Sequence, residues 1–234
     1  MMIVRTSDPI TLVGGAELPE GLLEKAMALA PKVIAADSGA DTALDHEIIP
    51  HAVIGDFDSI SDAARARIPE AVQHADPDQD STDFEKCLAA IEAPLIIGLG
   101  FFGDRLDHQL SACNALTRSA WHRCILLGQG DLMFLCPPTI DLPLPDGCRV
   151  SLFPLGAVEG VSDGLRWPIS GLNFSPDGRV GTSNAATGPV HLSVTSPKML
   201  VILPLEMLTL AARALRDATA RWPARRDKES SECL

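Results

Sequence analysis

The sequence predicts an α/β domain built on a doubly wound, mainly parallel sheet, followed by a smaller all-β sandwich domain. Up to about residue 135, short aliphatic runs alternate with helix-patterned segments, and a proline-rich stretch follows. Beyond it come several brief strand-like runs with turn residues between them. Alternating strands and helices indicate βαβ units, whereas clustered short strands indicate an antiparallel sandwich or barrel.

The first part contains the elements expected of a parallel sheet with crossover helices. The expected strands lie in ITLVGG (10–15), KVIAA (32–36), HAVIGD (51–56), PLIIGLG (94–100) and RCILLG (123–128). The expected helices lie in PEGLLEKAMALA (19–30), SDAARARI (61–68), TDFEKCLAAIEA (82–93) and DRLDHQLSACNALTRSA (104–120). Sheets of this kind bind ligands beyond the carboxyl ends of their strands.

The second part begins after CPPTIDLPLPDGC (136–148), which predicts a linker because proline neither continues a helix nor suits a central strand. The expected strands lie in RVSLFPLG, LNFS, RVGTSN, VHLSVTS and KMLVILPL, with PDG and TGP as turns between runs. A final helix is expected in 206–222, with Met207, Leu210, Ala211 and Leu215 on one side. We therefore expect domains at 1–137 and 138–222 and a flexible tail at 223–234.

Composition sets the class of protein. The chain has 234 residues, 46% of them hydrophobic and 21% charged, which is typical of a globular protein. Its net charge of −12, with no early cluster of Lys and Arg, argues against nucleic-acid binding. No signal peptide or membrane-span pattern occurs, so we expect a cytoplasmic protein. Six scattered cysteines without a C-x-x-C pair indicate buried thiols rather than a zinc or redox site.

Aspartates gather in four places where a strand ends or a helix begins. They are Asp37 and Asp41; Asp56 and Asp58; Asp76, Asp78, Asp80 and Asp83; and Asp104 and Asp107. A single aspartate is most often a helix cap or a turn residue. Four clusters after successive strands instead indicate a shared crevice. In IGDFDSI, strand alternation would point Asp56 and Asp58 the same way, and two such charges repel unless a cation or a proton lies between them, which indicates half of a metal site.

The run DPDQDSTDFEKC has acids at alternate positions but is not an EF-hand loop, because Ser81 stands where glycine is needed and Cys87 where Glu is needed. The remaining carboxylates suit magnesium, which binds through one or two of them together with substrate phosphates. Thr82 and Glu85 form a capping-box pattern, so Glu85 is expected to be structural. Asp83, in the first turn, is open between cap and metal ligand.

GLGFFG (98–103) matches a dinucleotide fingerprint but lacks the acid about twenty residues later, and Asp104 follows it directly. Its glycines better suit close approach to a metal-bound nucleotide, with Arg105 contacting phosphate or forming a surface salt bridge. In the following helix, Leu106, Leu110, Cys113 and Leu116 are expected to pack, and Asp104, Asp107, His108 and Ser111 to share another face. Taken alone, His108 is more often scaffolding than a ligand or base. No G-x-S-x-G, H-E-x-x-H or P-loop pattern occurs.

In the second part, GLRWPI places Trp167 beside a proline, and GTSN brings Ser183 and Asn184 after a glycine. A tryptophan in such a region is by default a core or interface residue. An exposed indole face would instead suit a flat or cationic heteroaromatic ligand.

The motifs ADSGAD, IGDFDSI, DQDSTDFEKCL, GDRLDHQL, GLRWPI and GTSN resemble, in this order, those of the thiamine pyrophosphokinases, which transfer pyrophosphate from ATP to the hydroxyl of thiamine. The resemblance spans most of residues 35–195. It implies an α/β catalytic domain, a β-sandwich, and a homodimer with thiamine near the subunit boundary. Two positions depart from the family pattern: Asp104 stands for a glycine, and Ala185 for an acid.

The resemblance also implies roles for individual residues. It implies magnesium ligands at Asp56, Asp58 and Asp83, and catalytic roles for Asp58, Asp83 and Asp107, with Asp83 or Asp107 accepting the hydroxyl proton. It further implies ATP or phosphate contacts at Asp37, Ser38, Arg105 and His108, and thiamine contacts at Trp167, Ser183 and Asn184.

Two other functions stay open at this stage. The acidic clusters alone would suit another magnesium-dependent phosphotransferase or a diphosphate hydrolase. The two departures would suit a nucleotide- or metal-sensing module without catalysis.

Overall fold

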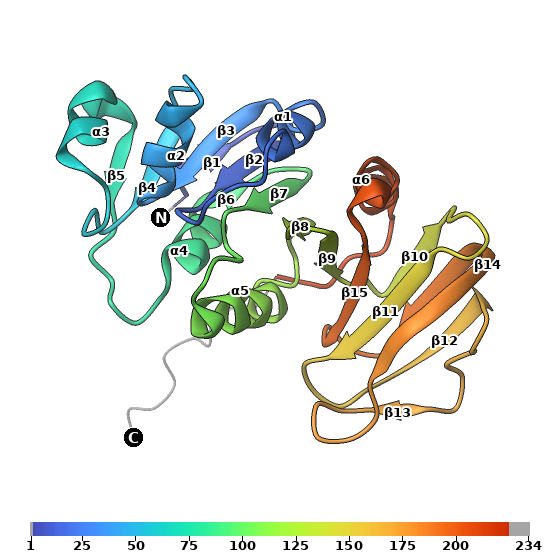
Figure 1. Cartoon of the computed structure of the whole chain (residues 1–234). Helices are drawn as coiled ribbons and strands as arrows, with labels where there is room; N and C mark the ends of the chain where they lie inside the picture. The colour runs from blue at the N-terminus through green and yellow to red at the C-terminus, as the bar shows by residue number, and fades with distance from the viewer. Residues whose placement is uncertain (1, 225–234) are drawn as a thin grey trace, which may run out of the picture.

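The computed structural model describes residues 2–224. It shows an α/β part and an antiparallel part, with strands β9 and β15 between them (Figure 1). The α-helices are α1 Leu22–Met27, α2 Gly39–Asp45, α3 Asp62–Arg67, α4 Asp83–Ala90, α5 Leu106–Arg118 and α6 Leu208–Asp217; short 3-10 turns cover Glu70–Val72 and Leu205–Met207. The predicted fold class is confirmed.

The strands of the α/β part include two short outer ones and the central sheet. Their bounds are β1 Val4–Arg5, β2 Ile10–Val13, β3 Lys32–Ala36, β4 Ala52–Gly55, β5 Gln73–Ala75, β6 Ile91–Glu92, β7 Ile96–Leu99, β8 Cys124–Leu127 and β9 Asp131–Leu135. Strands β5, β4, β3, β2, β7 and β8 lie side by side and run parallel. In chain order the sheet grows from β2 first through β3, β4 and β5 and then, on the other side of β2, through β7 and β8. The order therefore reverses between β2 and β7.

The antiparallel part has six further strands. Their bounds are β10 Thr139–Leu142, β11 Arg149–Pro154, β12 Val158–Leu165, β13 Asn173–Phe174, β14 Gly181–Val194 and β15 Met199–Pro204. Strand β14 pairs with β11 through its first half and with β10 and β12 through its second half, so it belongs to both layers of the sandwich. Strand β15 returns to pair with β9, which joins the sandwich to the parallel strands in one continuous sheet.

Two predictions in the antiparallel part were wrong. The expected linker contains strand β10, because its prolines flank Thr139–Leu142 rather than interrupt it, and β10 pairs with only one strand. The expected turn at TGP lies inside β14, where Gly188 has a φ of 127° and bends the strand. A bend at this point lets one strand serve both layers.

The packing faces of two helices also differ from the prediction. On α5, Ala112, Ala115 and Leu116 are buried, whereas Leu106 and Leu110 are 65% and 61% exposed. The helix rests on the sheet through these three residues, and Leu106 and Leu110 lie on its outward side. On α6 the buried set is Leu208, Ala211, Ala212 and Leu215, and Met207 and Leu210 are only partly buried.

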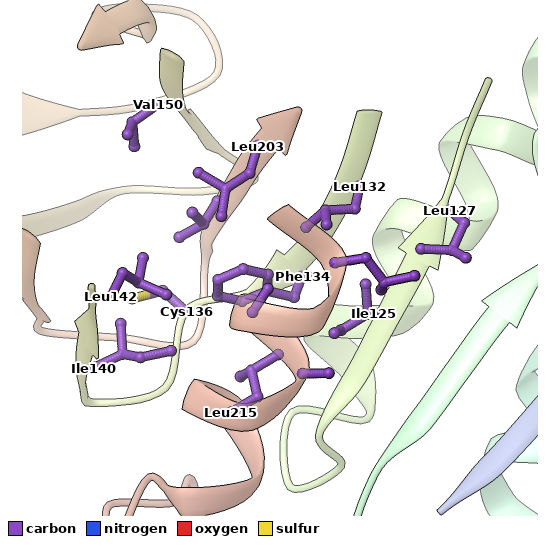
Figure 2. Close-up of a cluster of buried hydrophobic side chains, with 14 of the residues drawn as sticks. Ile125, Leu127, Leu132, Phe134, Cys136, Ile140, Leu142, Val150, Leu203 and Leu215 are labelled. Carbon is purple, nitrogen blue, oxygen red and sulfur yellow. The ribbon is translucent and has the colours of Figure 1, made fainter. Parts of the chain in front are cut away.

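Helices cover both faces of the parallel sheet. Alternation along β2 sends Ile10 and Leu12 toward α4 and α5 and Val13 toward α1. The largest core cluster continues from this second face, under α6, into the sandwich, with Phe134 of β9 at its centre (Figure 2). One hydrophobic core therefore spans both parts of the chain.

The five cysteines in the described part of the chain are free thiols. Cys87, Cys124 and Cys136 are buried, and burial raises the pKa of Cys136 to about 12. Cys233 and most of the expected tail at 223–234 lie outside the described residues. No helix between residues 2 and 224 combines the length and the apolar character needed to cross a bilayer.

We expect Phe134→Ala to lower the free energy of unfolding by about 3–5 kcal/mol, because it empties a fully buried aromatic position. Urea denaturation followed by circular dichroism would measure this. Leu110→Ala, at an exposed position, is the control and should change stability by less than about 0.5 kcal/mol. Equal effects of the two substitutions would contradict the placement of Phe134 at the centre of the core.

Candidate active site

A hollow of about 480 Å³ opens where the carboxyl ends of β2, β3 and β4 meet the start of α4. It lies at the reversal of strand order between β2 and β7, the usual position of ligand sites in open α/β sheets. Gly14 after β2 and Gly100 after β7 are in close contact there. A Cβ on Gly14 would lie 2.5 Å from the Gly100 carbonyl oxygen, so larger residues are excluded.

Three aspartates converge in this hollow. Carboxylate oxygens of Asp37, Asp56 and Asp58 all lie within 4.8 Å of one another. Two of these, Asp56 and Asp58, were predicted metal ligands, and Asp37 was a predicted phosphate-side residue. Like charges held this close repel unless a cation or a proton lies between them.

The strongest indication of a cation-binding site is the buried carboxylate of Asp37. The residue is 2% exposed, and its Oδ1 has no hydrogen-bond partner among residues 2–224, while its Oδ2 accepts from the Ser59 N–H at 3.1 Å. Burial, and then the charge of Asp83, raise the pKa of Asp37 above its ordinary value, although N–H donors from Ser59 and Ser38 oppose this. An orphaned oxygen among carboxylates fits a hard divalent cation, which takes oxygen ligands.

Backbone geometry, rather than strand alternation, brings Asp56 and Asp58 together. Strand β4 ends at Gly55, and Phe57 takes a φ of 63° in the bend that follows. Asp37, after β3, has a φ of 44°. Left-handed backbone at a residue other than glycine costs of order 1–3 kcal/mol and persists where the surrounding structure enforces it. The carboxylates meet because of these two bends, which the alternation argument did not include.

Asp83 lies beside this group without belonging to it by distance. Its Oδ1 accepts a hydrogen bond at 3.1 Å from the Nζ of Lys86, three residues along α4. The same Nζ donates to Asp56 Oδ2 at 3.1 Å. The hydrogen bond from Lys86, more than any other contact, lowers the pKa of Asp56. Burial alone would lower the pKa of Lys86, but its bonds to Asp83 and Asp56 outweigh burial and raise it.

Lys86 is one of two residues at the site that were not predicted from the sequence. Its side chain is 2% exposed and borders the hollow. Its spacing of three residues from Asp83 on a helix could have shown that the two side chains meet. Gln79, whose Nε2 donates to Asp56 Oδ2 at 3.0 Å, was also missed, because it comes from an irregular loop.

The capping box predicted at the start of α4 is confirmed. Thr82 Oγ1 accepts from the Glu85 N–H, and the Glu85 carboxylate accepts from the Thr82 N–H. Glu85 also pairs with Arg118 of α5 at 2.6 Å. Asp78 accepts from the Ser81 hydroxyl and the Asp80 N–H, which makes it a turn residue that does not border the hollow. Glu85 is thus structural, as expected.

The other predicted phosphate-side residues divide into two groups. Ser38, Arg105 and His108 border the hollow, as does Asp104, one of the two departures from the family pattern. Asp107 does not border it, and its side chain is 68% exposed. Arg105 donates to Asp107 through Nη2 at 2.7 Å, and this bond lowers the pKa of Asp107. In this structure Arg105 therefore forms the surface salt bridge that was one of its two predicted roles.

The three predicted thiamine-side residues lie together in the sandwich. Asn184 is 7% exposed; its Oδ1 accepts the Trp167 N–H at 3.2 Å, and its Nδ2 donates to the Trp167 carbonyl at 2.7 Å. Trp167 is 56% exposed, with the Arg166 guanidinium 5.7 Å from its ring centre. Ser183 has a φ of 61°, and its N–H donates to Ser151 Oγ. Asn184 thus holds the loop that presents an exposed indole.

Within one chain, this tryptophan group and the acidic hollow are not brought together. None of Trp167, Ser183 and Asn184 borders the hollow. Strand β14 is eight strand spacings from β4, roughly 40 Å along the sheet. Figure 1 shows the two regions on opposite sides of β9 and β15.

Comparison with known proteins identifies the family. A family model described as the catalytic domain of thiamin pyrophosphokinase matches residues 23–126, and one described as its vitamin B1 binding domain matches residues 139–199. A thiamine pyrophosphokinase of Bacillus subtilis is 41% identical over 163 residues, which cover 64% of this chain and 76% of the relative. The chain belongs to the thiamin pyrophosphokinase family.

Further matches cover less of the relative's own length or, for solved structures, show the fold. A thiamine pyrophosphokinase 1 of rice is 30% identical over 154 residues, so the match spans 58% of that protein. The solved thiamin pyrophosphokinase of Candida albicans has a TM-score of 0.71 at 14% identity, with 86% of this chain and 93% of that one covered. The B. subtilis structure has a TM-score of 0.68 at 23% identity, with 84% and 98% covered.

We expect Asp37→Asn to stabilise the metal-free chain at pH 8 by about 1–2 kcal/mol, because an amide there carries no charge and can donate to a neighbouring carboxylate. Since the pKa of Asp37 is raised, the folded chain holds that proton more tightly than the unfolded chain. The stability that protonated Asp37 contributes is fully present below its unfolded-state pKa of 3.8 and is lost as pH rises through its folded-state pKa. The advantage of the variant should therefore vanish in acid.

Urea unfolding in a chelator between pH 3 and pH 8 would test this, with Asp177→Asn as a control for charge at an exposed position. Added Mg²⁺ should stabilise the original chain more than Asp37→Asn, because binding to the folded state alone adds stability. If Asp37→Asn is less stable than the original chain at pH 8 without metal, the charge of Asp37 does not destabilise the metal-free cluster, and the prediction is wrong.

Proposed function

We propose that this chain transfers a pyrophosphoryl group from ATP to the hydroxyl of thiamine, giving thiamine diphosphate and AMP. The observation that carries the proposal is the group of Asp37, Asp56 and Asp58 at the switch point of the sheet, in a chain that belongs to this family. Pyrophosphoryl transfer requires positioning and charge neutralisation more than a covalent nucleophile. A shared acidic hollow supports that chemistry.

We propose Mg²⁺ as the cofactor. Asp56 and Asp58 would hold it, and Asp37 offers a further carboxylate oxygen within the same group. Asp83 stays a predicted ligand, with its Oδ1 engaged by Lys86. Bound magnesium would supply positive charge to the phosphate oxygens.

The chain's own residues would then orient the substrates and take the proton. In the proposed step, the thiamine hydroxyl oxygen bonds to the β-phosphorus, the bond between that phosphorus and the α–β bridging oxygen breaks, and AMP leaves. Of the two predicted proton acceptors, Asp83 borders the hollow and Asp107 does not, which favours Asp83. Ser38, Arg105 and His108 also border it and would contact ATP.

We further propose that the working unit is a homodimer, in which Trp167, Ser183 and Asn184 of one protomer face the acidic hollow of the other. The separation of these two groups within one chain supports this arrangement, since neither group alone can bring both substrates together. The exposed indole of Trp167 would contact thiamine, and Asn184 would hold its loop in place. The domain boundary near residue 137, the cytoplasmic location and the absence of nucleic-acid partners stay predictions.

Products separate the candidate functions. Incubation with ATP, Mg²⁺ and thiamine should yield AMP and thiamine diphosphate in equal amounts. ADP or inorganic phosphate would instead indicate another phosphotransferase or a hydrolase, and binding without products would indicate a sensor.

We expect Asp58→Asn to lower the rate of AMP formation at least about a hundredfold, because it removes a charge where the polyphosphate must be neutralised. Asp58 is exposed, so the fold should be retained. Chromatography of nucleotides would measure the rate, thermal unfolding would verify the fold, and Asp177→Asn would serve as the matched control. Full activity in folded Asp58→Asn would refute its assignment as a metal ligand.

Mixed dimers would test the shared site. Asp58→Asn and Trp167→Ala protomers, co-expressed with different tags and purified as heterodimers, carry one doubly defective and one intact site if each site uses both protomers. We expect about half of the original activity at low thiamine, although each homodimer is impaired. If heterodimers recover no activity above that of the homodimers, the site lies within one chain.

A further inference from the structure

Lys86 is the only lysine or arginine within residues 2–224 that is buried. It lies on α4 and borders the acidic hollow, a position that the sequence did not predict for it. A buried ammonium is costly unless charge and hydrogen bonds compensate it, and Asp56 and Asp83 supply both at 3.1 Å. The chain therefore holds a fixed positive charge inside this site.

The charge balance of the hollow shows why a polyphosphate would need that ammonium. Among the described residues that line it are five carboxylates, Asp37, Asp56, Asp58, Asp83 and Asp104, but only two permanently basic side chains, Lys86 and Arg105. Arg105 is 68% exposed and engaged with Asp107. A triphosphate entering the hollow adds further negative charge. Lys86 is thus the buried protein cation available to it.

The hydrogen bonds of Lys86 leave one donor for a ligand. An ammonium has three N–H donors. Asp56 and Asp83 take two of them, and no third acceptor occurs among residues 2–224. A buried donor without a partner is unfavourable, and a charge-assisted bond to phosphate would satisfy it. The two carboxylates also fix the position of the nitrogen, so little order has to be gained on binding.

We propose that Lys86 is a further catalytic residue, whose third N–H donates to a phosphate oxygen of the group being transferred. The inference rests on the proposed function. It goes beyond the ion-pairing role that the two bonds to aspartate would give Lys86 by themselves. A residue that only positioned the aspartates would affect the affinity for phosphate solely through the bound metal ion.

The test measures binding of inorganic tripolyphosphate and of ATP by calorimetry, at increasing and finally saturating Mg²⁺, together with AMP formation. We expect Lys86→Met to weaken both ligands at least about tenfold, because a charge-assisted hydrogen bond is lost. The loss should persist at saturating Mg²⁺. The matched control is Lys32→Met, which removes the same charge at the end of β3 away from the hollow. There the Nζ of Lys32 donates to Thr6 Oγ1 at 3.1 Å. This substitution should leave both affinities unchanged.

Two results would overturn the proposal: unchanged affinity in Lys86→Met, or a loss that disappears as Mg²⁺ is raised, which would mark a positioning residue. If Lys86→Met does not fold, Lys86→Gln takes its place with the same expectation, because its amide can still donate to the carboxylates but has neither the charge nor a third donor. If the original chain binds polyphosphate without forming AMP and thiamine diphosphate, the proposed function is refuted. The effect of the Lys86 variant on polyphosphate binding can still be interpreted in that case. An original chain that binds no polyphosphate would refute both.

Discussion

Repulsion between carboxylates in one hollow is the constraint on which the site depends. Asp37, Asp56 and Asp58 come from loops after two different strands, and their oxygens lie within 4.8 Å of one another. Such an arrangement is stable only if cations or protons compensate it. The chain supplies one cation itself, the ammonium of Lys86, and leaves the inner oxygen of Asp37 without any protein donor among the described residues. The compensation is therefore incomplete in a way that suits a metal ion and a polyanionic substrate together.

The rest of the fold holds this arrangement rigidly. The capping box fixes the first turn of α4, and with it Asp83 and Lys86. The contact between Gly14 and Gly100 holds the loops after β2 and β7 together at the switch point, where phosphate would bind. Beneath both, a single hydrophobic core runs from the parallel sheet into the sandwich through Phe134.

The sandwich presents an exposed aromatic side chain at a defined place. Buried Asn184 bonds to both backbone groups of Trp167, so the loop is fixed although the indole is exposed. Strand β14 carries Asn184 in its first half and bends at Gly188 to close the two layers in its second. Because β15 joins the sandwich to β9, the tryptophan group has a fixed place far from the hollow of its own chain. In the proposed homodimer, a second copy of the chain would bring the two groups together.

The amino-acid sequence by itself determined the fold class, most strands and helices of the parallel sheet although not β5 or α2, the capping box of α4, and the gathering of aspartates at strand ends. These depend on local periodicity and on short-range hydrogen bonds, which a sequence states directly. Only the tertiary structure decided that β9 pairs with β15, that α5 leaves Leu106 and Leu110 exposed, that Asp37 rather than Asp83 completes the tight group, and that Lys86 is buried between two acids. Each of these depends on contacts between residues distant in the chain or on two left-handed bends, and no local pattern encodes how closely such segments approach.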